Sequence, residues 1–219
     1  MPSRIKREKE TIVKADDFLQ ESIADFATNA VATAKIAALK AKRNEIEAEE
    51  ESKISSGGGA RQNYGIAKDA DDALHDAMQD VANFAASMTD EIPALEEKFR
   101  MPRSSSRRNK IAVARSFAAN APEYKAAFIA QGLDADFIED LVTKANTLEQ
   151  VLAAAVSETA KRIGATNKQP LLVKDANKII KSLDPIVRKV YRNDPAKLAA
   201  WNFASHVQRD EKPKPKPTV

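Results

Sequence analysis

A run of apolar residues in the middle of the chain recurs in alternating steps of four and three residues. This 3.5-residue period is typical of a helix that packs along one side against other helices. A half-buried strand would alternate at every second residue, and no four-residue run alternates in this way with β-branched residues. The repeat therefore predicts a core built from long helices. Its members are Leu74, Met78, Val81, Ala85, Met88, Ile92, Leu95 and Phe99.

The composition agrees with an all-α fold. Alanine supplies 39 of the 219 residues, whereas there are 6 glycines and 5% aromatic residues. Ala, Lys and Glu favour helices, and the absence of cysteine excludes a disulfide framework or a cysteine-ligated zinc site. We expect an antiparallel up-and-down helical bundle of two long helical hairpins, with short accessory helices and disordered termini.

Glycine and proline indicate where the helices should end. Three glycines at 57–59 predict a turn between a helix at 16–51 and a second helix at 61–99, which Pro93 would kink. Gly164 and Pro170 predict a further break. The other expected helices are 107–131 (interrupted at Pro122), 134–163, 171–192 and 196–208, the last capped by Asp194.

These breaks define the expected domain organisation. One helical-bundle domain should occupy most of the chain between a basic flexible N-terminus and a disordered tail rich in Lys and Pro. The expected ranges are 1–15 for the N-terminus, 16–209 for the domain, 16–100 and 104–209 for its two hairpins, and 210–219 for the tail.

Charge is distributed unevenly along the chain. Residues 66–98 contain nine acidic and two basic residues, a net charge of −7, and residues 161–192 carry a net charge of +7. Either acidic and basic helices pair within one bundle, or the basic segments form a surface for nucleic acid or another acidic partner. The candidate basic residues between them are Arg100, Arg103, Arg107, Arg108, Lys110 and Arg115.

Residues able to support catalysis or metal binding are scarce. A di-iron bundle needs two Glu-x-x-His motifs, and the nearest match is Asp72-x-x-His75, for which no second copy exists. The glycines at 57–59 are not followed by the Gly-Lys-Ser/Thr sequence of a phosphate-binding loop. We therefore expect no catalytic residue, cofactor or metal, and the pattern favours a protein that is not an enzyme.

Two functions from different classes remain as hypotheses. The first is a protein-interaction or scaffold bundle, in which a seam made of Leu74, Met78, Val81 and Met88 pairs with a second copy as a homo-oligomer. The second is a nucleic-acid-associated protein that uses the basic 100–115 segment and the 161–192 helix. The charged N-terminus has no apolar signal segment and no run of 18 apolar residues occurs, so we expect a cytoplasmic protein without a membrane span.

The last third of the chain resembles the ending of uncharacterised bacterial α-helical-bundle proteins. The resemblance rests on the stretch Asp194-Pro195-Ala196-Lys197-Leu198-Ala199-Ala200-Trp201 and on the preceding Leu183-Asp184-Pro185. It implies a helical fold and a bacterial source, and it brings no activity and no functional residue.

Overall fold

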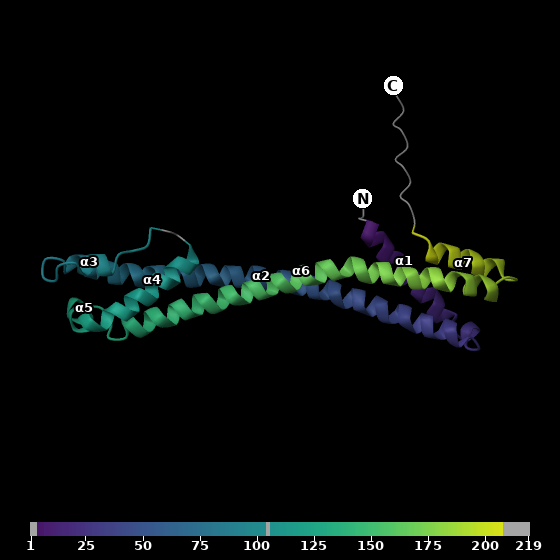
Figure 1. The fold of residues 1–219 in the computed structure, drawn as a ribbon, viewed down its shortest axis with the longest axis horizontal. Coiled ribbons are helices and arrows are strands. Elements are labelled where there is room, and N and C mark those ends of the chain that lie inside the picture. The colour runs from purple at the N-terminus through teal and green to yellow at the C-terminus, as the bar shows by residue number, and fades with distance from the viewer. Residues whose placement is uncertain (1–3, 104–105, 208–219) are drawn as a thin grey trace, which may run out of the picture. The chain divides into compact units, whose positions relative to one another are not determined.

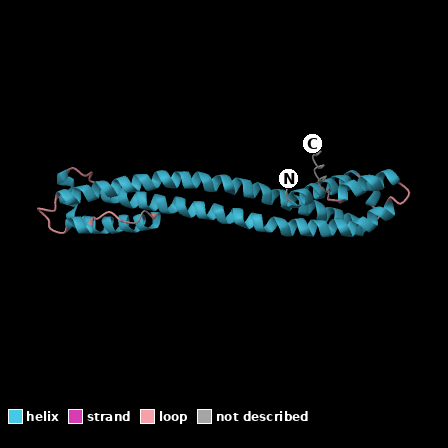
Figure 2. Cartoon of the chain, turned by 90° about the horizontal axis from the view of Figure 1, so that it is seen from above, coloured by secondary structure: helices cyan, strands magenta, loops and turns pink. Residues whose placement is uncertain are grey.

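The computed structural model describes residues 4–103 and 106–207, and every regular element in these ranges is a helix (Figures 1 and 2). The all-α prediction is therefore confirmed. None of these helices combines the length and the apolar character needed to cross a membrane. In chain order the elements are α1 (Arg4–Glu21), the 3₁₀ helix η1 (Ile23–Phe26), α2 (Ala30–Ser87), α3 (Leu95–Lys98), α4 (Arg107–Asn120), the 3₁₀ helix η2 (Ala121–Tyr124), α5 (Lys125–Gln131), α6 (Phe137–Val190) and α7 (Pro195–Ser205).

The chain forms two compact units, to each of which α2 and α6 contribute residues. Unit 1 combines the two ends of the chain, Met1–Ile54 and Arg162–Val219, and unit 2 is the middle, Ser55–Lys161. Each unit has its own cluster of buried apolar side chains. The expected tail at 210–219 and residues 1–3 of the expected flexible N-terminus lie outside the described residues.

Unit 1 is built from α1, η1, α7 and the adjoining parts of α2 and α6. Within it α2 and α6 are antiparallel, since Lys35 contacts the Ser182 carbonyl and Glu49 pairs with Lys168. Helices α1 and α7 pack on each other. Trp201 of α7 is fully buried, and its ring centroid lies 5.6 Å from that of Phe18 in α1.

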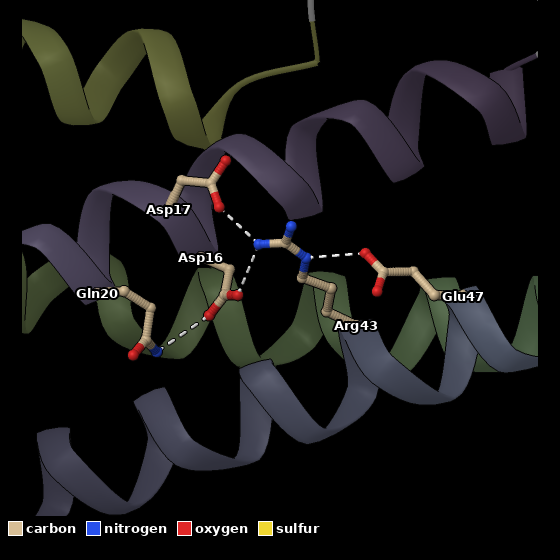
Figure 3. Close-up of polar contacts among 5 residues, drawn as sticks. All are labelled: Asp16, Asp17, Gln20, Arg43 and Glu47. Atoms are coloured by element: carbon tan, nitrogen blue, oxygen red, sulfur yellow. Dashed lines mark hydrogen bonds and ion pairs between the residues drawn. The ribbon is translucent and has the colours of Figure 1, made fainter.

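Helix α1 is also held on α2 by a group of charged side chains (Figure 3). The Asp16 carboxylate is 2% exposed and accepts a hydrogen bond from Arg43 at 3.0 Å. Arg43 also pairs with Asp17 and with Glu47, and Gln20 donates to Asp16. The hydrogen bonds to Glu47 and Asp17 raise the pKa of Arg43 above its ordinary value, so the guanidinium stays charged.

Unit 2 buries the 3.5-residue repeat that the sequence predicts. Seven of its eight members are at most 1% exposed, and Ile92 packs against them half-buried. Phe99 lies at the centre of an aromatic group, with ring centroids 5.3 Å from Phe117 and 5.2 Å from Phe128. Ser106 accepts the hydrogen bond that caps α4, and Gly132 ends α5 at a φ of 114°, which glycine adopts without strain.

The expected positions of several turns are wrong. Residues 55–59 and 164–170 lie inside α2 and α6, so neither segment forms a turn, and the hairpins 16–100 and 104–209 do not exist with those boundaries. Burial on both sides of these breakers outweighs their cost, which is about 1 kcal/mol for an interior glycine and about 3 kcal/mol for an interior proline. Ile46 and Ala60 provide that burial around the glycines, and Ala155 and Val173 provide it around 164–170.

Two further expectations near the N-terminus are wrong. Residues 4–15 are not flexible but form most of α1, because Thr11, Ile12 and Ala15 are buried in unit 1. The expected helix at 16–51 is interrupted after Glu21, and α2 starts anew where Asn29 caps it by accepting from the Ala32 amide at 3.1 Å.

The second expected helix also ends early. Helix α2 stops at Ser87, six residues before Pro93, so that residue does not kink it. Turns lead from there to α3, with Ala94 at a positive φ of 69°. The expected interruption at Pro122 is confirmed as η2, and Asp194 caps α7 as predicted by accepting from the Lys197 amide at 3.0 Å.

Candidate functional site

The basic residues at 100–115 do not act as one free surface. Lys110 and Arg107 both pair with Asp71 of α2, at 2.8 and 3.4 Å. Arg115 pairs with Glu149 and Arg100 with Glu97. Arg103 and Arg108 are exposed, and they alone of the six have no ion pair among the described residues. Much of the segment's charge is therefore matched by acidic residues of unit 2.

The candidate self-association seam is occupied within a single chain. Leu74 and Met78 are 0% exposed, and Val81 and Met88 are 1% exposed. They pack in the unit 2 cluster with residues of α4, α5 and α6. A second copy would find no exposed seam here, because the 3.5-residue repeat faces the chain's own helices.

Neither histidine belongs to a cluster of potential metal ligands among the described residues. His75 is exposed, and the described residues contain no group of three potential metal ligands among His, Cys, Asp and Glu. His206 Nδ1 lies 3.2 Å from Ser205 Oγ and 3.0 Å from the Asn202 carbonyl. Both neighbours of this nitrogen belong to the end of α7 itself.

A groove in unit 1 brings together basic side chains that the sequence spreads over most of its length. Its volume is about 980 Å³, and its walls are the start of α1, one face of α6 and the end of α7. We call it the basic groove. Its charged lining residues are Arg4, Glu8, Lys174, Lys178, Lys181, Asp184 and Arg188.

The helical period explains why α6 presents these cations together. Lys174, Lys178 and Lys181 follow one another in steps of four and three, and Arg188 comes seven residues later. Such steps keep side chains on one face of a helix. The opposite face carries the residues that anchor α6 in unit 1, among them Ala176, Leu183 and Val187. Ile5, Ile180 and Val207 add apolar surface to the groove.

Ion pairs leave part of this charge unmatched. Arg188 pairs with Asp184 at 2.8 Å, Arg4 with Glu8 at 2.8 Å and Lys178 with Asp175 at 2.9 Å. Lys174 and Lys181 are exposed and make no ion pair within residues 4–103 and 106–207. The lining holds five Lys or Arg and two acidic residues, a net charge of +3 with His206 neutral. The groove is therefore suited to an anionic group.

Asp184 connects the basic groove to the core of unit 1. It accepts a hydrogen bond from Trp201 Nε1 at 2.9 Å and one from Arg188. Burial acts to raise the pKa of Asp184, but the hydrogen bonds from Arg188 and Trp201 outweigh it and hold that pKa below its ordinary value. A carboxylate held in this way fixes one wall of the groove to α7.

This arrangement predicts a loss of stability in acid. A carboxyl group whose pKa is lowered by folding stabilises the protein fully above its unfolded pKa of about 3.9, and the effect disappears as the pH falls through the lower folded value. We expect the urea midpoint followed by Trp201 fluorescence to fall below about pH 4, and to fall less steeply in Asp184→Asn. Equal pH dependence in both proteins would contradict the role of Asp184.

The sequence interpretation missed the part of this site that α1 and α7 supply. The sequence predicts a flexible N-terminus for Arg4, Ile5 and Glu8, although the helical spacing of Ile12, Ala15 and Leu19 indicates a buried face close by. The 161–192 region carries the net charge of +7 noted in the sequence. Its residues divide between the basic groove and positions outside it, such as Lys168, Lys189 and Arg192.

Comparison of the chain with protein-family models, curated proteins and solved structures found no significant match.

Proposed function

We propose that this protein is a non-catalytic interaction module whose basic groove binds an acidic segment of a partner protein. The observation that carries the proposal is the gathering of cations from α1 and α6 beside apolar side chains in one groove. Lys174 and Lys181 form no ion pair with an acidic residue of the described chain. Charge complementarity of this kind speeds association and selects the partner.

A protein segment suits the groove better than nucleic acid does. Ile5, Ile180 and Val207 offer an apolar surface, and the lining residues include no Phe, Tyr or Trp to stack on bases. Glu8 and Asp184 would repel a continuous row of phosphates. An amphipathic peptide helix can instead place an acidic residue every three or four positions, opposite the lysines of α6, with apolar residues beside them.

Charge reversal on α6 tests this proposal. The probe is a fluorescein-labelled amphipathic peptide with Glu in steps of three and four and Leu on the adjoining face. We expect Lys174→Glu/Lys181→Glu to weaken its binding about tenfold at physiological salt, because two attractive contacts become repulsive. Fluorescence anisotropy measures the affinity.

The matched control reverses two exposed cations outside the basic groove, Lys189→Glu/Arg192→Glu. It changes the net charge equally and should leave the affinity nearly unchanged. Equal weakening by both double variants would contradict a defined groove. Tighter binding of duplex DNA or RNA than of the peptide, lost in the groove variant, would favour the nucleic-acid hypothesis instead.

A further inference from the structure

Unit 1 has a second groove, separate in chemistry from the basic groove. It lies between α1, the part of α2 near Glu50, and α6 around Gln169, and its volume is about 590 Å³. That size falls within the range of small-molecule sites, which is roughly 300–1,000 Å³. Ile5, Val13 and Pro170 give it an apolar wall. We call it the Gln169 groove.

The buried amide of Gln169 is the feature that points to a ligand. Gln169 is 6% exposed and lines the groove, and its Nε2 is buried without a hydrogen-bond partner among the described residues. Buried polar groups in folded proteins are nearly always hydrogen-bonded, because an unsatisfied donor destabilises the fold. If the side chain turns toward the groove, an acceptor atom on a bound molecule satisfies this amide.

The charged side chains around the groove define the charge of that molecule. Lys9 pairs with Glu50 at 3.0 Å, and the lining as a whole has four lysines and two glutamates, a net charge of +2. A negatively charged group is therefore attracted to the groove. The lining lysines besides Lys9 are Lys6, Lys14 and Lys53.

We propose that the Gln169 groove binds a small amphipathic carboxylate. Its carboxylate oxygen accepts a hydrogen bond from Gln169 Nε2, and its aliphatic body lies on Ile5, Val13 and Pro170. The lysines attract its charge. This proposal is independent of the function of the basic groove, because Ile5 is the only lining residue that the two grooves share.

Decanoate is the probe, and isothermal titration calorimetry measures its binding to the full chain. We expect saturable binding that becomes at least about tenfold weaker in Gln169→Leu, since one charge-assisted hydrogen bond is lost. The same substitution should raise the melting temperature of the ligand-free protein by about 2–4 °C, because it removes an unsatisfied buried donor. Gln169→Met, also without a donor, is the second variant and should give the same two results.

Gln150→Leu is the matched control, because it makes the same change at an exposed position of α6 in unit 2. It should alter neither the affinity nor the melting temperature in this way. Decan-1-ol, which has the same chain and no charge, should bind at least about tenfold more weakly than decanoate. The proposal is overturned if decanoate does not bind the unaltered protein, if both Gln169 variants bind it as tightly, or if decan-1-ol binds equally well.

Discussion

Replacing Arg43 by methionine is expected to lower the free energy of unfolding of unit 1 by about 3 kcal/mol. Asp16 is almost completely buried, and Arg43 is the cation that pairs with it (Figure 3). Without the guanidinium, the carboxylate keeps the hydrogen bond from Gln20 and loses its opposite charge. A buried charge left without a partner destabilises a protein far more than the loss of an exposed ion pair.

Two further variants identify the cause of this loss. Asp16→Leu/Arg43→Met removes both charges and should return stability to within about 1 kcal/mol of the unaltered protein. Glu47→Gln removes an exposed partner of the same arginine and should change stability by less than about 0.5 kcal/mol. Urea unfolding followed by the fluorescence of Trp201, the single tryptophan, measures all three. A double variant as unstable as Arg43→Met would show that the buried charge is not the reason.

Replacing Phe99 by alanine is expected to destabilise unit 2 by about 3–5 kcal/mol. Phe99 is 0% exposed, and its ring makes edge-to-face contacts with Phe117, Tyr124 and Phe128. The substitution therefore leaves a cavity and removes aromatic contacts from all three neighbours. It tests whether the last residue of the 3.5-residue repeat belongs to the core although α2 ends at Ser87.

Hydrogen exchange read by mass spectrometry measures this effect within unit 2. Peptides from α4 and α5 should lose protection in Phe99→Ala. Phe203→Ala, at a ring that is 58% exposed in unit 1, is the control and should cost less than about 1 kcal/mol. Unchanged protection of α4 and α5 in Phe99→Ala would contradict a core role for Phe99.

The repeat that begins at Leu74 could be predicted well because the spacing of its apolar residues alone determines which side chains face the core. Its members are buried even where the helix gives way to turns after Ser87, since apolar side chains of the turns still face the core. The sequence also predicts an apolar stripe for the helix expected at 16–51, and the structure buries only two of its members, Leu19 and Phe26. The stripe consists of Leu19, Ile23, Phe26, Ala30, Ala34, Ala37 and Ala41. A new helix begins near Asn29, which shifts the phase, so Ile36 and Leu39 are buried while Ala34 and Ala37 are exposed.

Glycine and proline predict turns at the wrong places because the helix stability that they cost is smaller than the stability gained from the buried residues around them. In unit 2 a Cβ added at Gly59 would lie 3.4 Å from Glu158 Cγ, so α6 passes close to α2 at this point. Small side chains there permit contact between the helices, and the helix continues. Pro170 likewise lies inside α6, directly after the buried Gln169 and before the buried Leu172.

The basic groove was only partly predictable. The helical steps among Lys174, Lys178 and Lys181 could be read from the sequence, and they place three cations on one face. Which other elements would border that face depends on how α1 and α7 pack around Trp201, which is a tertiary property. The Gln169 groove was not predictable, since an unsatisfied amide exists only once its neighbours are placed.

Site-resolved NMR of a titration with the acidic peptide tests the central claim most directly. The proposed function predicts that backbone amide shifts change at the groove residues of α1, α6 and α7, around Ile5, Lys178 and Ser205, and saturate with one affinity. Residues 100–115 should stay unchanged. Shift changes centred on Arg103 and Arg108, with none in the basic groove, would contradict the proposal and identify the 100–115 segment as the binding surface.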